Sequence, residues 1–285
     1  MTADDDLARV LAAEAGRRLL ARRARGGDAG DLRAAGDRLS HEFLAAELGR
    51  LRPRDAVLSE EARDDPARLT ADRVWIVDPL DGTREYGEPG RSDWAVHVAL
   101  WERGELTAGA VALPAQSRVL STAEPPPPPR PAGTSQAGEP AFAQPLRIVV
   151  SRSRPPWFAA RVAQDIGATL MPLGSAGAKA AAVIAGEADA YLHDGGQYEW
   201  DSAAPVAVAL AAGLHASRLD GSKLEYNKAS PWQPDILICP GKLADRLIAA
   251  VGAVRQSGSE QNPPPSVPPV MPDRMPDRPE STRWP

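Results

Sequence analysis

Apolar residues spaced three and four positions apart open the chain and predict helices. Residues 4–25 carry leucines and a valine at this spacing among alanines and arginines, after an acidic first turn, as in an amphipathic helix. Gly26-Gly27 and Gly30 are predicted to end it. A second helix is predicted over residues 37–50, with its leucines and phenylalanine on the buried side.

Shorter apolar runs follow and predict strands. Residues 56–58 and 74–77 each form a run of this kind that ends in acidic residues. Further along, residues 94–100, 106–113 and 118–122 are separated by turn residues such as Arg103-Gly104. This succession is typical of an antiparallel meander.

Strand and helix signals alternate in the second half of the chain. The predicted strands cover residues 146–150, 169–171, 190–192 and 235–239, and the predicted helices cover residues 157–165, 175–185, 201–212 and 241–254. A meander followed by alternating strands and helices predicts an α+β protein with two sub-domains arranged in layers.

Two proline-rich segments delimit these sub-domains. Residues 124–145 include five consecutive prolines and few apolar residues, which predicts a flexible loop. Residues 256–285 lack core-forming residues and are predicted to be a disordered tail. The predicted sub-domains are therefore residues 1–123, with the candidate metal site, and residues 146–255.

The composition excludes several classes of protein. With 285 residues, 43% of them hydrophobic, the chain can bury a substantial core. A net charge of −5 gives no basic field for nucleic acid or acidic lipid, and no apolar run approaches the roughly 20 residues that span a bilayer. The only cysteine, Cys239, excludes an intrachain disulfide and suits a reducing compartment. We expect a cytoplasmic protein without nucleic-acid or membrane partners.

The most informative segment is residues 75–83, Trp-Ile-Val-Asp-Pro-Leu-Asp-Gly-Thr. Its apolar start predicts a buried strand that delivers Asp78 and Asp81 to one end, where the Asp-Pro pair and Gly82 permit a sharp turn. Two carboxylates and the Leu80 carbonyl are oxygen ligands of the kind that Mg²⁺ prefers. Thr83 then stands at a predicted helix start, where main-chain N–H groups favour phosphate. The alternative is that Asp-Gly-Thr is an ordinary turn and helix cap.

Other acidic residues could complete a metal site. Glu60 and Glu61 end the preceding strand, so one of them could face the cation if neighbouring strands end at the same edge; the alternative is a solvated strand edge. Asp201 precedes an alanine-rich helix, where it could hold a second cation or act only as a helix cap. Lys179, one of four lysines, could contact phosphate or be an ordinary surface lysine. The four histidines lack metal-ligand spacing, and we interpret them as structural: His41, His97, His193 and His215.

Together these segments resemble the inositol monophosphatase and fructose-1,6-bisphosphatase superfamily of Mg²⁺-dependent, Li⁺-sensitive phosphomonoesterases. Residues 58–61, 78–85, 150–153 and 174–179 are similar to its CysQ group, the 3′(2′),5′-bisphosphate nucleotidases, and residues 94–97 and 195–200 look closest to actinobacterial members. The resemblance implies a layered αβαβα sandwich with the site between the sub-domains, and commonly a homodimer.

The resemblance also implies roles for individual residues. The metal ligands for two or three Mg²⁺ per subunit would be Glu60, Asp78, the Leu80 carbonyl, Asp81 and Asp201. Thr83 matches a hydroxyl that activates water together with an upstream aspartate. Asp37 is the best match for that aspartate and Asp31 is the rival, because the family's usual lysine and threonine are missing here. The candidate substrate-binding residues are Gly82, Thr83, Arg84, Ser151, Arg152, Ser153, Ser175 and Lys179.

The implied function is hydrolysis of the 3′-phosphate of 3′-phosphoadenosine 5′-phosphate, and of its sulfated form, in sulfur assimilation. Metal ions suit this reaction because a phosphate dianion repels hydroxide, so negative charge must be neutralised while a water is activated. The near alternatives are inositol monophosphate or fructose 1,6-bisphosphate as substrate. A more distant alternative is a non-catalytic binding protein of the same fold.

Overall fold

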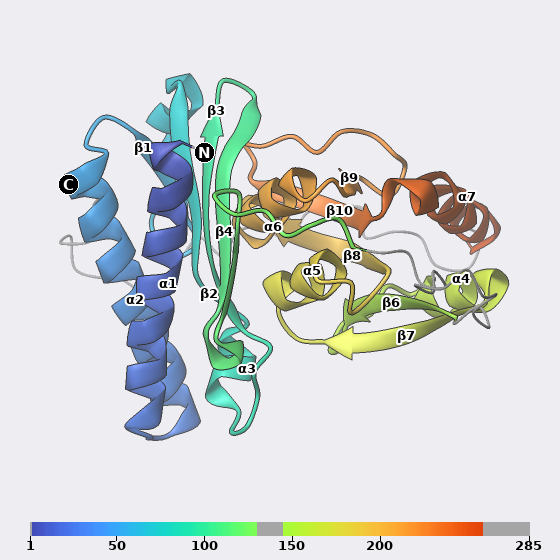
Figure 1. Cartoon of the computed structure of the whole chain (residues 1–285), viewed down its shortest axis with the longest axis horizontal. Helices are drawn as coiled ribbons and strands as arrows, with labels where there is room; N and C mark the ends of the chain where they lie inside the picture. The colour runs from blue at the N-terminus through green and yellow to red at the C-terminus, as the bar shows by residue number, and fades with distance from the viewer. Residues whose placement is uncertain (1, 130–144, 259–285) are drawn as a thin grey trace.

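The computed structural model describes residues 2–129 and 145–258. Two long helices, α1 (Ala3–Ala24) and α2 (Ala29–Leu51), pack side by side on the outer face of the first sheet (Figure 1). That sheet has the strand order β1-β2-β3-β4-β5 and consists of β1 (Ala56–Ser59), β2 (Arg73–Asp81), β3 (Ala95–Glu102), β4 (Glu105–Leu113) and β5 (Arg118–Ser121). Strands β2 to β5 pair antiparallel, which confirms the predicted meander, and β1 pairs parallel to β2.

The second sheet has the order β7-β6-β8-β10-β9 and consists of β6 (Leu146–Ser151), β7 (Ala168–Leu173), β8 (Ala190–Tyr198), β9 (His215–Ser217) and β10 (Trp232–Cys239). Helices α5 (Ala176–Ile184) and α6 (Glu199–Ala211) lie between the two sheets, whereas α4 (Ala159–Ile166) and α7 (Gly241–Gly258) cover the far face (Figure 1). The result is the expected αβαβα sandwich.

Three apolar cores hold these layers together. The first lies under α1 and α2, the second between the sheets around α5 and α6, and the third under α4 and α7. Strand β2 contributes to two of them, because alternate side chains point to opposite faces: Trp75 and Val77 pack under α1 and α2, while Val74 and Ile76 pack toward α6. A strand that is buried on both faces needs the continuous apolar run seen in the sequence.

The second helix begins earlier than predicted. The side chain of Asp28 accepts hydrogen bonds from the main-chain N–H groups of Gly30 and Asp31, so Asp28 caps α2 and Gly30 lies in its first turn. The first helix does end before Gly26-Gly27, as predicted, but the prediction that Gly30 also belongs to this break was wrong. The same helix contains Gly36, a position that requires glycine because the Tyr86 ring packs against it. A Cβ at this position would stand 2.7 Å from a carbon of that ring.

Other boundaries also differ from the prediction. Strand β9 was not predicted, and neither were the short helices η1 (Pro66–Thr70) and η2 (Pro114–Gln116). Residues 256–258, predicted to be disordered, form the end of α7, and residues 259–285 lie outside the described residues. In the predicted flexible loop, residues 124–129 and 145 have no helix or strand, and residues 130–144 lie outside the description. No helix of the described residues is long and apolar enough to cross a bilayer.

We predict that Gly109→Ala destabilises the protein by about 1–3 kcal/mol. Gly109 lies where β4 meets α6, and a Cβ at this position would stand 2.6 Å from the Cβ of Ala207, so the helix would have to shift. Urea denaturation measures the change. Gly252→Ala in α7 is the matched control, because no atom lies within 4 Å of its Cβ and alanine favours helix by up to about 1 kcal/mol. Equal effects of the two substitutions would contradict close packing of α6 on β4.

Candidate active site

A break in the pairing of β2 creates the turn that carries the two aspartates. Asp78 pairs with His97 of β3 and Asp81 pairs with Ala95, so the register shifts over the intervening Pro79-Leu80. The Leu80 N–H donates to the Asp78 carboxylate over 3.0 Å, which stabilises this bulge.

Gly82 follows the bulge in a left-handed conformation with φ of +84° and caps the short helix α3 (Thr83–Gly87). A Cβ at Gly82 would stand 2.8 Å from the Cβ of Ser175. Both the backbone conformation and this close approach require glycine.

Carboxylates from both halves of the chain meet at this turn. Asp78, Asp81 and Asp201 each offer an oxygen, and the three oxygens lie within 4.8 Å of one another. Asp201 comes from the first turn of α6, where its other role is to accept a hydrogen bond of 2.7 Å from the Tyr198 N–H. Glu60 follows β1, its N–H is 3.4 Å from the Val77 carbonyl, and its side chain hydrogen-bonds with Asp78. Oxygen-only ligands at this spacing suit a hard divalent cation.

The carboxylates destabilise one another's charged forms. Burial and the nearby charges of Glu60 and Asp81 raise the pKa of Asp78 well above its ordinary value. Although the Glu60 residue is exposed, the surrounding protein desolvates its carboxylate and the charge of Asp201 repels it, which together raise the pKa of Glu60 to about 8. Burial and the charge of Asp81 raise the pKa of Asp201 to about 6. A bound cation would relieve this repulsion, so the residues fit a metal site.

Asp81 differs from its neighbours because hydrogen-bond donors surround it. Its two carboxylate oxygens accept hydrogen bonds from the N–H groups of Ala176 and Gly177, at 3.1 and 2.6 Å, and these belong to the first turn of α5. Burial alone would raise the pKa of Asp81, but the proximity of His97 and Lys179 and these hydrogen bonds lower it. Asp81 therefore attaches the first sheet to a helix of the second half.

The Thr83 hydroxyl can donate its hydrogen bond to either of two oxygen atoms. Its hydroxyl is 3.2 Å from a carboxylate oxygen of Asp37 on α2 and 3.0 Å from the Leu80 carbonyl. Asp31, the rival for Asp37, lies in the exposed first turn of α2. The structure thus places Asp37 beside Thr83 and does not bring Asp31 to this contact.

Several predicted substrate-binding side chains support local structure. The Lys179 ammonium is buried and donates to the carbonyls of Gly174 and Ser175, at 2.6 and 2.7 Å. The Ser175 hydroxyl caps α5 by accepting from the Ala178 N–H, and the Ser151 hydroxyl accepts from the Arg154 N–H. These contacts shape the turns around the acidic cluster.

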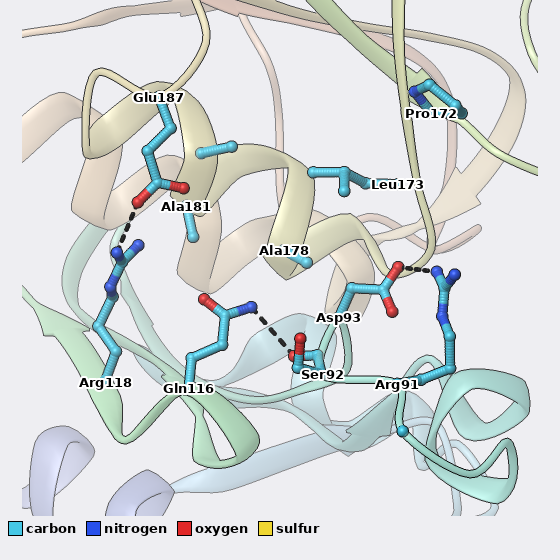
Figure 2. A pocket seen from close by; sticks show the side chains of 12 residues that line it. Arg91, Ser92, Asp93, Gln116, Arg118, Pro172, Leu173, Ala178, Ala181 and Glu187 are labelled. Atoms are coloured by element: carbon cyan, nitrogen blue, oxygen red, sulfur yellow. Dashed lines mark hydrogen bonds and ion pairs between the residues drawn. The ribbon is translucent and has the colours of Figure 1, made fainter.

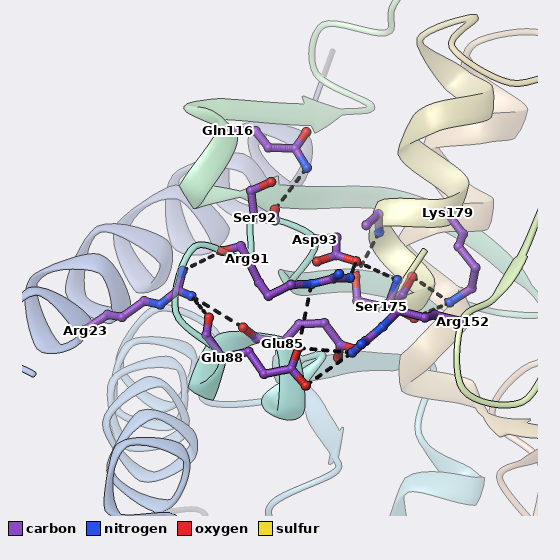
Figure 3. A network of polar contacts seen from close by, with 12 residues as sticks. Arg23, Glu85, Glu88, Arg91, Ser92, Asp93, Gln116, Arg152, Ser175 and Lys179 are labelled. Carbon is purple, nitrogen blue, oxygen red and sulfur yellow. Dashed lines mark hydrogen bonds and ion pairs between the residues drawn. The ribbon is translucent and has the colours of Figure 1, made fainter. Parts of the chain in front are cut away.

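The predicted arginines lie at the surface. Arg152 donates through Nη2 to Glu85 at 2.6 Å and to Glu88 at 3.3 Å, which links the end of β6 to α3 (Figure 3). Its Nη1 and Nε form no hydrogen bond or ion pair with other described residues, so the guanidinium keeps further donors. Arg84 and Ser153 are exposed.

A cavity of about 300 Å³ lies between residues 90–93 and α5 (Figure 2). Its charged side chains form two ion pairs, Arg91 with Asp93 and Arg118 with Glu187. None of the four predicted carboxylate ligands lines it. The acidic cluster, and not this cavity, is therefore the candidate active site.

Sequence reasoning missed two side chains around the cluster. His97 was interpreted as structural, yet it lies 3.2 Å from Asp81. Asp93 was not considered, yet its carboxylate accepts from the Gly174 N–H at 2.7 Å and so supports the turn before α5. The alignment of β3 against β2, which places His97 opposite Asp78, is the signal that could have identified the histidine.

Comparisons with known proteins agree with this geometry. The model of the inositol monophosphatase family matches residues 2–256. A 3′-phosphoadenosine 5′-phosphate phosphatase of Mycobacterium bovis is 54% identical over 222 residues, which cover 76% of this chain and 80% of that protein. The 3′(2′),5′-bisphosphate nucleotidase CysQ of Salmonella typhimurium is 32% identical, covering 67% and 78%. The crystal structure of CysQ from Bacteroides thetaiotaomicron superposes with a TM-score of 0.69 at 27% identity, covering 82% and 96%.

We predict that, without divalent cations, the free energy of unfolding falls between pH 6.5 and 8. The pKa of Glu60 rises from 4.5 to about 8 on folding, so in this range the folded state binds more protons than the unfolded state. A fully shifted group contributes about 1.4 kcal/mol per pH unit, and because Glu60 is exposed, solvent screening makes its contribution smaller than this. Below pH 6.5, His193 acts in the opposite direction, since burial lowers its pKa to about 4.

Chemical denaturation of chelator-treated protein across this pH range, with Glu60→Gln as the comparison, measures the effect. The substitution should flatten the fall. Added Mg²⁺ should flatten it as well, because the cation favours the ionised carboxylates. Identical pH dependence of wild type and Glu60→Gln would contradict the crowding of Glu60 with the other acids.

Proposed function

This chain belongs to the inositol monophosphatase family, and from that premise we propose that it is a metal-dependent phosphatase of 3′-phosphoadenosine 5′-phosphate. The observation that carries the proposal is the cluster of Asp78, Asp81 and Asp201 oxygens beside the Thr83–Asp37 pair. The substrate is inferred from the mycobacterial relative of that name, at 54% identity. We extend the proposal to the sulfated form of this nucleotide and to a role in sulfur assimilation.

The metal is proposed to be Mg²⁺, with two or three ions per subunit. Glu60, Asp78, Asp81, Asp201 and the Leu80 carbonyl would hold them. In support, oxygens of Asp78, Asp81 and Asp201 lie within 4.8 Å of one another, and Glu60 hydrogen-bonds with Asp78. Bound Mg²⁺ supplies charge neutralisation on the phosphate and lowers the pKa of a coordinated water.

The chain's own contribution to proton transfer comes from Thr83 and Asp37. The Thr83 hydroxyl donates a hydrogen bond to Asp37, so its lone pairs can accept the proton of an attacking water while its own proton passes to the Asp37 carboxylate. Asp37 thus sets the direction of the hydroxyl. The N–H groups of Gly82 and Thr83 at the start of α3 are proposed to bind the phosphate that is cleaved.

The second phosphate and the nucleoside are proposed to lie along residues 151–153 and 174–179. Arg152 is the strongest candidate for phosphate, because only one nitrogen of its guanidinium is engaged with Glu85 and Glu88. Arg84 and Ser153 are exposed and are proposed to assist. Ser151, Ser175 and Lys179 are proposed to shape the walls, since their polar atoms already support turns. A cytoplasmic homodimer without nucleic-acid or membrane partners stays a prediction.

Phosphate release from three substrates in parallel tests the proposed specificity. With Mg²⁺ present, kcat/KM for 3′-phosphoadenosine 5′-phosphate should exceed that for inositol 1-phosphate and fructose 1,6-bisphosphate by at least about tenfold, and Li⁺ should inhibit. A nucleotide with two phosphates offers Arg152 a second anionic group, which inositol 1-phosphate lacks. Equal values for the three substrates would exclude a preference for the nucleotide, and no hydrolysis of any would favour a binding protein of the same fold.

Asp37→Asn should lower kcat by about 10²- to 10⁴-fold, the usual contribution of a positioned proton acceptor, with little change in folding. Asp31→Asn is the matched control on the same helix and should keep wild-type kcat, because Asp31 lies in the exposed first turn of α2. Steady-state kinetics at saturating Mg²⁺ gives both values. The reverse result, with only Asp31→Asn impaired, would transfer the role to Asp31.

A further inference from the structure

His97 makes two contacts that join groups from different parts of the fold. It lies in the middle of β3 and is fully buried. Its Nδ1 is 3.1 Å from the main-chain carbonyl oxygen of Trp200, the residue before Asp201 on α6. Its Nε2 is 3.2 Å from Oδ2 of Asp81 at the end of β2. One imidazole ring thus contacts the predicted metal ligand Asp81 and the main chain next to a second one, Asp201.

The chemistry of the partners fixes the orientation of the ring. A carbonyl oxygen only accepts hydrogen bonds, so Nδ1 must carry a proton and donate it to Trp200. With this nitrogen held, Nε2 lies 3.2 Å from the Asp81 carboxylate, an ion-pair contact that attracts the carboxylate when Nε2 carries a proton as well. An apolar ring of similar size could fill the same space but would leave the Asp81 oxygen without this neighbour.

The surrounding backbone is adapted to the ring. A Cβ at Gly177 would stand 2.2 Å from Nε2 of His97, so only glycine leaves room for the imidazole at this point of α5. The N–H of the same Gly177 donates to Oδ2 of Asp81 at 2.6 Å. The histidine and the glycine therefore approach one carboxylate oxygen from β3 and from α5.

We propose that His97 is a positioning residue, which sets the distance between Asp81 and Asp201 so that both carboxylates can bind one metal ion. The ring holds the first turn of α6 through Trp200 and holds β2 through Asp81. Neighbours of metal ligands that orient them in this way typically contribute 10- to 100-fold to metal affinity. The inference rests on the proposed function, because it requires that the acidic cluster binds a divalent cation.

Isothermal titration of the full-length chain with Mg²⁺ tests the proposal without turnover. His97→Phe keeps a ring and loses both contacts, so it should weaken Mg²⁺ binding about 10- to 100-fold. His97→Asn keeps a donor in the place of Nδ1, and His97→Gln keeps one in the place of Nε2. Each of these two should fall between wild type and His97→Phe. At saturating Mg²⁺, the KM for the phosphate ester should stay within about threefold of wild type.

The matched control is His215→Asn, since His215 lies on β9 and its ring contacts Ser217. It should bind Mg²⁺ like wild type. A folded His97→Phe protein with wild-type affinity would overturn the proposal, as would equal weakening by His215→Asn. If His97→Phe does not fold, wild-type affinity in both His97→Asn and His97→Gln overturns it. Absence of Mg²⁺ binding by the wild-type chain would refute the proposed function itself, and the inference with it.

Discussion

Repulsion between carboxylates that are crowded together is the constraint on which the candidate site depends. Asp78, Asp81 and Asp201 approach within 4.8 Å, and Glu60 hydrogen-bonds with Asp78. Left to themselves, such groups separate or take up protons. The site therefore needs a scaffold that holds the acids together and a cation that compensates their charge. The layered fold supplies the scaffold, and the family supplies the expectation of a metal.

The scaffold works because the acids sit at the ends of elements that are anchored in apolar cores. Strand β2 is buried on both faces, and α6 packs between the two sheets with its alanines against β4. Asp81 adds a polar link, since its oxygens accept hydrogen bonds from the first turn of α5. A shift of α6 would move Asp201 away from the aspartates of β2, so packing between the layers and metal binding are physically coupled.

The parts of the site that share one segment could be predicted from the sequence. The residue types from Trp75 to Thr83 determine the local backbone conformation. The apolar residues form a strand, the proline prevents a helix, and the glycine allows the chain to turn. The predicted order of strands and helices follows in the same way from local periodicity. The start of α2 was misjudged because the cap that Asp28 provides outweighs the breaking tendency of Gly30.

Contacts between distant segments could not be predicted in this way. In the sequence, His97 is a single polar residue within an apolar strand. Its position opposite Asp78 follows only from the pairing of β3 with β2. The sequence predicted that Lys179 either contacts phosphate or is an ordinary surface lysine, whereas its ammonium is buried and donates to two carbonyls of its own turn. The approach of Asp37 to Thr83 depends on how α2 packs against α3, which local patterns do not encode.

The most direct measurement is anomalous diffraction from a crystal of this chain grown with Mn²⁺ in place of Mg²⁺. We predict at least one anomalous peak within bonding distance of oxygens of Asp78, Asp81 and Asp201 together. Occupancy of Mn²⁺ elsewhere, with no peak between these three carboxylates, would contradict it.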